Sequence, residues 1–221
     1  KVGQFVATNM IRNIVGQPRN PFNIRDIMDK EKILLIKLSK GILGEENAQL
    51  LGAMMITKIY QSAMSRADTK EEDRKDFSLY VDEFQNFATE TFGEILSEAR
   101  KYRLQLILAH QFLGQLEDKI RKTVFGNVGS LISFRVGAED ARILEQEFHP
   151  IFRERDFVNL GVQELYIKML VDGQSKDAFS ARSLNVTYPK DDFAADIIKK
   201  SRAKYALPKV EVEKILQQWN E

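Results

Sequence analysis

The chain has 221 residues, and its 33 lysines and arginines balance 32 aspartates and glutamates, so a net charge of +1 gives no overall case for nucleic-acid binding. Its hydrophobic fraction of 43% is enough for a folded core, and the lack of cysteine excludes disulfides, zinc–cysteine sites and thiol nucleophiles. Two histidines are too few for a histidine-rich metal site, and no apolar run approaches the roughly 20 residues of a membrane helix.

Four short aliphatic segments are predicted as β-strands. They are residues 33–38, 77–82, 104–109 and 131–136. Apolar residues at helical spacing predict helices over residues 45–65, 91–102, 114–125 and 138–148. This alternation is typical of βαβ units with a parallel sheet, so we expect an α/β fold. The nearly continuous apolar runs also predict strands that are buried on both faces.

The second half of the chain has a different pattern. Residues 164–171 and 177–185 flank the polar loop 172–176 and are predicted as an antiparallel hairpin that closes one edge of the sheet. Two final helices are predicted over residues 191–205 and 208–219. We therefore expect a main domain over residues 1–185 and a C-terminal helical tail over residues 186–221.

An acidic pair follows the second predicted strand. A hydrophobic strand that ends in two adjacent carboxylates is the pattern of a Walker B element, and residues 79–83 read Leu-Tyr-Val-Asp-Glu. In that interpretation Asp82 holds Mg²⁺, directly or through water, and Glu83 orients or deprotonates the water that attacks a γ-phosphate. The alternative is an acidic pair that only begins a loop and caps the next helix. The five residues alone leave both interpretations open.

Polar residues also end the next predicted strand, where His110 and Gln111 follow residues 104–109. In RecA-like ATPases a polar residue at this place reaches the γ-phosphate or the attacking water, so Gln111 is a candidate nucleotide sensor. The alternative for Gln111 is a loop amide that satisfies nearby backbone groups, and His110 is interpreted as structural. Because ligands bind at the carboxyl ends of open parallel sheets, the two strand ends together favour a nucleotide site.

A basic cluster, Arg100-Lys101-Tyr102-Arg103, ends the helix before that strand. Cations stabilise helix C-termini by roughly 0.3–1 kcal/mol, which is a sufficient explanation on chemistry alone. The alternative is an arginine finger that Arg100 presents to the γ-phosphate of a neighbouring subunit.

The sequence lacks a recognisable phosphate-binding loop. Such a loop needs G-x-x-x-x-G-K-[ST], and none of the 12 glycines is followed by lysine. Residues 39–44, Ser-Lys-Gly-Ile-Leu-Gly, contain glycines after a predicted strand but in the wrong order, so they are interpreted as a turn into the next helix. We expect that this chain alone neither binds ATP tightly nor hydrolyses it.

Several segments occur in the order found in one known family. Residues 80–87 read Tyr-Val-Asp-Glu-Phe-Gln-Asn-Phe, residues 98–102 read Glu-Ala-Arg-Lys-Tyr, and residues 109–112 read Ala-His-Gln-Phe. Further matching segments are residues 33–41, 44–45, 50–53, 126–129, 134–137 and, in the tail, 201–205. Together they resemble HerA/VirD4/TraD-type P-loop ATPases, with the main part of the resemblance covering about residues 10–150.

The resemblance implies a RecA-like, mainly parallel sheet flanked by helices, within a hexameric DNA motor of the kind that feeds DNA into conjugative type IV secretion systems. It implies that Asp82 binds Mg²⁺, that Glu83 activates water and that Gln111 is the sensor. Arg100 is implied as a finger acting in trans, and Arg135 is a weaker second candidate for an inter-subunit role. The implied cofactors are ATP and Mg²⁺. The implied partners are a homohexamer, DNA, and secretion or relaxosome proteins, in the cytoplasm or at the cytoplasmic face of the inner membrane.

The missing phosphate-binding loop is the main departure from this family, whose members carry it upstream. We therefore expect that the chain is the C-terminal part of such an ATPase. A non-catalytic RecA-like interaction module of a secretion or DNA-partition complex is the alternative that the missing loop supports. A superfamily 1 helicase fragment shares Asp-Glu-Phe-Gln but has a Gly-Asp-x-x-Gln motif where this chain has Leu-Ala-His-Gln. A Rossmann-type oxidoreductase is disfavoured because no G-x-G-x-x-G follows a predicted strand.

Overall fold

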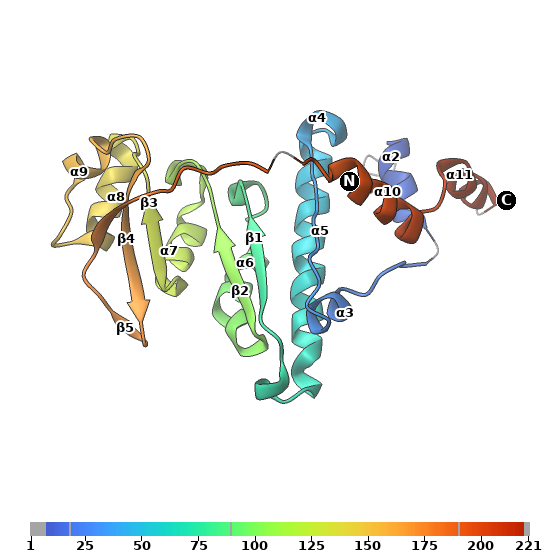
Figure 1. Cartoon of the computed structure of the whole chain (residues 1–221), viewed down its shortest axis with the longest axis horizontal. Helices are drawn as coiled ribbons and strands as arrows, with labels where there is room; N and C mark the ends of the chain where they lie inside the picture. Colours follow the sequence, from blue (N-terminus) through green and yellow to red (C-terminus); the bar gives the residue numbers. More distant parts are fainter. Residues whose placement is uncertain (1–7, 18, 89, 190, 219–221) are drawn as a thin grey trace. The chain divides into compact units, whose positions relative to one another are not determined.

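The computed structural model describes residues 8–17, 19–88, 90–189 and 191–218 and has a mixed α/β architecture (Figure 1). The chain forms two compact units. Of the described residues, unit 1 takes those within Lys1–Phe77, Lys101–Leu104 and Tyr188–Glu221, and unit 2 takes those within Ser78–Arg100 and Gln105–Thr187.

A small parallel sheet forms from the predicted second and third strands. These are β1 (Phe77–Val81) and β2 (Leu104–Leu108). At the start of the pair the Phe77 N–H donates to the Arg103 carbonyl at 2.9 Å, and at the end the Ala109 N–H donates to the Val81 carbonyl at 2.9 Å. Because the two strands start together and end together, the pair is parallel, as predicted. Burial alternates along β1, and Tyr80 is 74% exposed, so the prediction that the strands are buried on both faces is wrong.

A second sheet, of four strands, contains the predicted hairpin. Its strands are β3 (Ser130–Ser133), β4 (Glu164–Val171), β5 (Gln174–Ser175) and β6 (Phe179–Arg182). β4 is the central strand and pairs antiparallel with β3 on one side and with β5 and β6 on the other. Asp172 and Gly173 form the hairpin tip with φ of 51° and 76°, the left-handed conformation that two-residue hairpin loops require. The hairpin is therefore confirmed, but it does not close an edge of the β1–β2 sheet as predicted, because it forms a separate sheet in which β3 pairs with β4.

The helices of unit 2 follow the predicted order. They are α6 (Glu90–Glu98), α7 (Asp118–Asn127), α8 (Ala138–Phe148) and α9 (Glu154–Val158). α8 has the predicted bounds, whereas the helix predicted over residues 91–102 ends in a 3₁₀ turn at Ala99–Tyr102. Buried rings fill the end of this unit near α8, where Phe148 and Phe157 pack edge to face at 5.2 Å.

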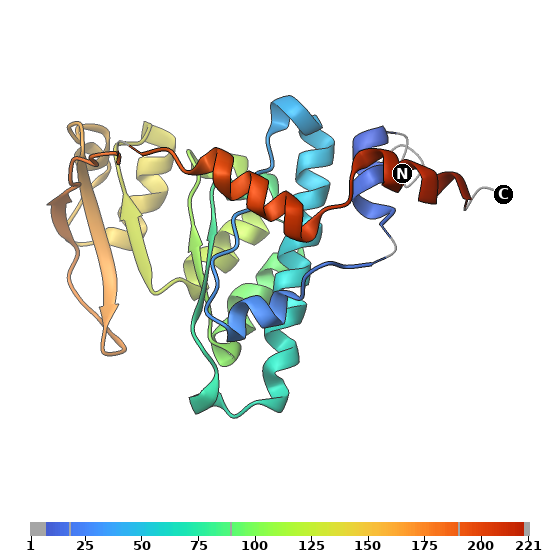
Figure 2. The ribbon, with the colours of Figure 1, turned by 45° about the vertical axis from the view of Figure 1, so that its right-hand side comes forward.

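The helices of unit 1 include the longest one of the described chain. They are α2 (Asn9–Val15), α3 (Ile24–Asp29), α4 (Lys40–Leu43), α5 (Glu45–Met64), α10 (Ala194–Tyr205) and α11 (Lys209–Gln218). Figure 2 shows α10 followed by α11, as the sequence predicts, although residue 219 lies outside the described part. α11 packs on α2, where Ile11 and Val212 are buried, and α3 packs on α5.

The predicted first strand, residues 33–38, is not a strand. The segment runs as an extended trace along α5 (Figures 1 and 2) and pairs with no other strand of the described chain. Ile33 is 88% exposed and Leu35 is 76% exposed. Apolar β-branched residues favour a strand, but a strand also needs a partner for its backbone N–H and C=O groups.

A buried arginine lies in the turn that follows α5 in unit 1. Arg66 follows α5 in a 3₁₀ turn and is fully buried. Its Nε lies 3.3 Å from Asp29 Oδ1, and its Nη2 donates to the carbonyl of Lys75. Burial lowers the pKa of Arg66. A second pair, Arg25 with Asp68, joins α3 to the same turn at 2.5 Å. The network thus connects α3, the end of α5 and the segment that leads into β1.

Replacing Arg66 by alanine should destabilise the chain by about 3 kcal/mol, because it opens a cavity and removes the donor to the Lys75 carbonyl. Urea unfolding followed by circular dichroism measures this loss. Arg12→Ala is the control, because Arg12 is exposed and its side chain bonds its helix neighbour Asn9 and no other residue of the described ranges, so its effect should stay within about 0.5 kcal/mol. Equal effects of the two substitutions would contradict the structural role of Arg66.

Candidate functional site

The ends of β1 and β2 bring two predicted site residues together. Gln111 Nε2 donates a hydrogen bond to Glu83 Oε1 at 2.6 Å, although the two residues are 28 positions apart. Parallel pairing causes this contact, because it places the carboxyl ends of both strands at the same edge. A carboxylate and an amide that the sequence assigns to two separate strand ends therefore form one site.

The backbone at the acidic pair has an uncommon conformation. Glu83 has φ 51° and ψ 45°, in the left-handed region. Asp82 Oδ1 accepts the Glu83 N–H at 2.9 Å, and Asn86 Nδ2 donates to the Glu83 carbonyl at 3.0 Å. Such a conformation in a non-glycine residue costs on the order of 1 kcal/mol, so the surrounding contacts must hold it. The bend leaves the Asp82 side chain exposed at the strand end.

A second amide binds the same carboxylate. Gln85 Nε2 donates to Glu83 Oε2 at 2.5 Å, so each carboxylate oxygen of Glu83 accepts one amide hydrogen bond. Gln85 lies in the 3₁₀ turn Phe84–Asn86, directly after the acidic pair. No role for Gln85 is predicted from the sequence. Its place two residues after Glu83 was the available signal, but the tight turn that points its amide back is not visible in the sequence.

Buried aromatic rings pack against the turn that follows Glu83. Phe84 is 0% exposed, and its N–H donates to the Ala109 carbonyl at 3.0 Å. Its ring lies 5.4 Å from Phe92 and 5.5 Å, edge to face, from His110. Burial lowers the pKa of His110 and outweighs the opposing effects of its neighbours. The His110 ring, interpreted from the sequence as structural, thus belongs to the packing under the Glu83 turn.

The two candidate arginines lie outside this cluster of contacts. Arg100 is exposed in the 3₁₀ turn Ala99–Tyr102, and Arg135 is exposed just after β3. Within the described ranges neither side chain forms a hydrogen bond or an ion pair. The structure therefore brings Glu83 and Gln111 together and leaves both arginines on the surface.

A complete metal site or phosphate cradle is not found in the residues that the structure describes. No group of three or more His, Asp or Glu side chains there could hold a metal ion. Asp82 supplies one carboxylate, the type of ligand that Mg²⁺ prefers. Ser39 precedes the four-residue helix α4, and Lys40 Nζ pairs with Glu45 at 2.9 Å, so residues 39–44 form a turn into α5, as predicted.

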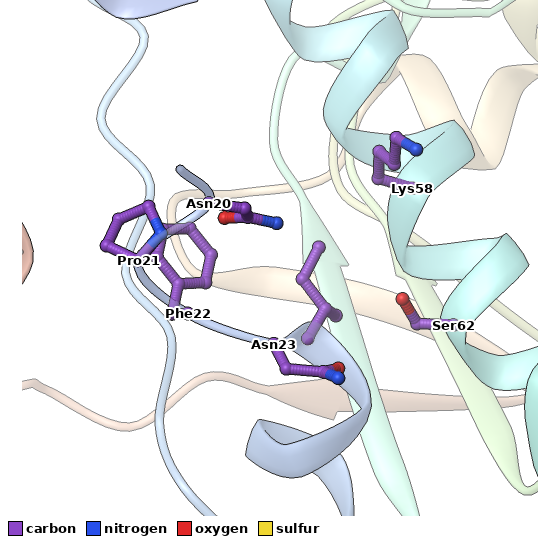
Figure 3. Close-up of a pocket in the computed structure, with 7 residues that line it drawn as sticks. Asn20, Pro21, Phe22, Asn23, Lys58 and Ser62 are labelled. Carbon is purple, nitrogen blue, oxygen red and sulfur yellow. The ribbon is translucent and has the colours of Figure 1, made fainter. Parts of the chain in front are cut away.

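A surface pocket of about 420 Å³ lies in unit 1 between α3 and α5 (Figure 3). Its lining residues are Asn20, Pro21, Phe22, Asn23, Ile24, Lys58 and Ser62. None of the predicted site residues lines it, and it holds no acid–base pair.

No helix in the described ranges is long and apolar enough to cross a membrane.

Comparisons with known proteins agree with the resemblance seen in the sequence. The family described as the TraM recognition site of TraD and TraG matches residues 76–146, which include Glu83, Arg100 and Gln111. No curated protein sequence matches the chain. The resemblance to TraD- and VirD4-type P-loop ATPases is therefore confirmed over the segment that contains the strand-end site.

Solved structures confirm the fold. The plasmid coupling protein TrwB, in complex with ADP and Mg²⁺, superposes with a TM-score of 0.68 at 16% identity and covers 86% of this chain. The chain spans about half of TrwB, 49% of its length. The genome packaging NTPase B204 from Sulfolobus turreted icosahedral virus 2, in complex with AMPPCP, gives a TM-score of 0.50 at 16% identity and covers 74% of this chain and 73% of its own. The predicted RecA-like α/β fold is thus confirmed.

The bond between Glu83 and Gln111 can be measured by a double-mutant cycle. We expect Glu83→Ala and Gln111→Ala to show a coupling energy of about 0.5–1.5 kcal/mol in urea unfolding of the chain. Any effect that the Glu83 substitution alone has on the left-handed backbone cancels in the cycle. A cycle of Glu83→Ala with Gln146→Ala, an exposed position on α8, is the control and should be additive. Additivity in both cycles would contradict the contact.

Burial of His110 predicts a dependence of stability on pH. Because its pKa in the folded chain is below 6.5, the unfolded chain takes up a proton first as the pH falls through 6.5. The contribution of neutral His110 to the free energy of unfolding is therefore fully present above pH 6.5. It decreases below that pH, by at most about 1.4 kcal/mol per pH unit for one site. His110→Phe should remove this part of the dependence between about pH 5 and 8. A stability difference between variant and wild type that is constant with pH would contradict it.

Proposed function

We propose that this chain is the Walker B half of an ATP-driven, DNA-translocating motor related to conjugative coupling ATPases. The observation that carries the proposal is the hydrogen bond between Glu83 and Gln111 at the shared edge of β1 and β2. An acid and an amide joined at adjacent strand ends suit a site that couples water activation to the detection of a phosphate. The likeness to a coupling protein bound to ADP and Mg²⁺ supports the same ligands.

Each side chain has a role in this proposal. Glu83 is the base that accepts a proton from water as the water oxygen bonds to the γ-phosphorus, while the bond from that phosphorus to the bridging oxygen breaks and ADP leaves. Gln111 leaves Glu83 Oε1 and bonds the γ-phosphate, which frees that oxygen for the water. Asp82 would hold Mg²⁺, whose charge offsets that of the phosphates. The proposal requires a phosphate-binding loop, and none of the 12 glycines of this sequence is followed by the lysine of such a loop.

Arg100 completes the proposed site from a neighbouring subunit. It is exposed, forms no hydrogen bond or ion pair within the described ranges, and lies in the family segment 76–146. A guanidinium reaching the γ-phosphate of a neighbour would require a ring of identical subunits, and we propose a hexamer. Arg135 is the second candidate for such a contact.

The comparisons support one of the proposed partners. The matched family is described by TraM recognition, so we propose a TraM-like protein of the relaxosome as a partner, with DNA as the substrate that is moved. A motor holds DNA mainly by phosphate contacts, which need no base recognition. We propose that the intact protein works at the cytoplasmic face of the inner membrane.

A non-catalytic interaction module is the second candidate function. The observation that favours it is the absence of a glycine followed by lysine in the sequence. In that case Asp82, Glu83 and Gln111 would serve only to connect the strand ends, and their replacement in the intact protein would not affect nucleotide turnover.

Subunit mixing in the intact ATPase tests the catalytic proposal. Glu83→Gln should keep ATP binding and abolish turnover, and Arg100→Ala should lower turnover by about a thousandfold. Equal mixing of the two variants should restore up to about a quarter of the sites, because an intact Arg100 then meets an intact Glu83 in a neighbour. Arg12→Ala is the matched arginine control and should leave turnover unchanged. Full turnover by Glu83→Gln would refute the site, and no recovery at any ratio would refute the role of Arg100.

A further inference from the structure

Glu83 is held by two amides that differ in their surroundings. Gln111 follows β2 and is exposed, whereas Gln85 is half-buried in the turn that follows Glu83 itself. Gln111 occupies Oε1 at 2.6 Å and Gln85 occupies Oε2 at 2.5 Å. One contact therefore bridges two strand ends and the other is local. Only the local contact can persist if Gln111 moves to a phosphate.

The turn that carries Gln85 is fixed on several sides. The Phe84 ring is fully buried, and the Phe84 N–H bonds the Ala109 carbonyl at 3.0 Å. Asn86 Nδ2 bonds the Glu83 carbonyl at 3.0 Å, and the Phe87 N–H bonds the Phe84 carbonyl at 2.9 Å. These bonds hold the backbone on both sides of Gln85. Its amide is therefore a preorganised donor, which is what the precise placement of a catalytic group requires.

The orientation of the Gln85 amide has a cost that packing does not explain. Its Nε2 must face Glu83, because the opposite orientation would place two oxygen acceptors against each other. Its Oε1 is then buried without a hydrogen-bond partner among the described residues. A buried acceptor in this state costs about 1–3 kcal/mol. The hydrogen bond to Glu83 is therefore the contact that sets the direction of this amide.

We propose that Gln85 is a positioning residue for the hydrolysis reaction. It holds Oε2 of Glu83 so that Oε1, once Gln111 has left it, faces the attacking water. Gln85 acts through Glu83 and does not touch the phosphate. This inference rests on the proposed function, since it has no meaning if Glu83 does not activate water.

Two substitutions in the intact ATPase separate positioning from packing. Gln85→Met keeps the length of the side chain and removes the donor, and we expect kcat to fall about tenfold with the KM for ATP unchanged. Gln85→Glu replaces the donor by a negative charge that repels Glu83, so kcat should fall further. A residue that only fills space would tolerate methionine. Gln146→Met, at an exposed position on α8, is the matched control and should leave both constants unchanged.

The outcomes distinguish this inference from the proposed function. Full turnover by Glu83→Gln would overturn both. An inactive Glu83→Gln together with wild-type kcat in both Gln85 variants would overturn the role of Gln85 alone. Should a Gln85 variant fail to fold, the side-chain amide signals of the 221-residue chain in nitrogen-15 NMR decide the question. Glu83→Ala should then shift the Gln85 and Gln111 signals and leave that of Gln146 in place, and an unmoved Gln85 signal would overturn the proposal.

Discussion

Parallel pairing places the carboxyl ends of β1 and β2 at one edge, and the arrangement of the site depends on it. The hydrogen bonds Phe77 to Arg103 and Ala109 to Val81 set the register of the pair. This register brings Gln111 to Glu83. A shift by one residue would move every side chain of a strand to the opposite face and would separate the two polar groups. The contact between Glu83 and Gln111 is therefore a consequence of the backbone pairing of the two strands.

The two compact units use different interactions to hold their polar groups. In unit 1 the buried Arg66 satisfies a backbone carbonyl and faces the Asp29 carboxylate, which fixes the segment before β1. In unit 2 the carboxylate of Glu83 is bonded by neutral amides and lies above an aromatic layer of Phe84, Phe92 and His110. The donors to Glu83 are thus neutral amides, whereas the group that faces Asp29 is a charged guanidinium.

Much of the fold could be predicted from the sequence, because patterns of period 2 and 3.6 report local burial. α8, the central hairpin and the two parallel strands follow directly from those patterns. Pairing between distant strands is not encoded in such patterns, so the partner of β3 and the lack of one for residues 33–38 could not be foreseen. The same holds for Gln85, whose amide direction depends on the left-handed backbone of Glu83. Glu83 and Gln111 could be predicted because a residue that follows a parallel strand in the sequence also lies at the carboxyl edge of the sheet.

The extended segment 33–38 has a consequence for the chain in concentrated solution. Ile33, Leu35 and Ile36 are exposed in a backbone whose N–H and C=O groups are not used by a sheet in the described chain. Short apolar segments of high β-propensity in this state form intermolecular sheets and promote aggregation. Lys32 and Lys37 flank or interrupt the run, and charges at such positions oppose stacking of identical strands. Colloidal stability of the isolated chain would then depend on ionic strength, because salt screens the repulsion between these lysines and leaves the apolar attraction in place.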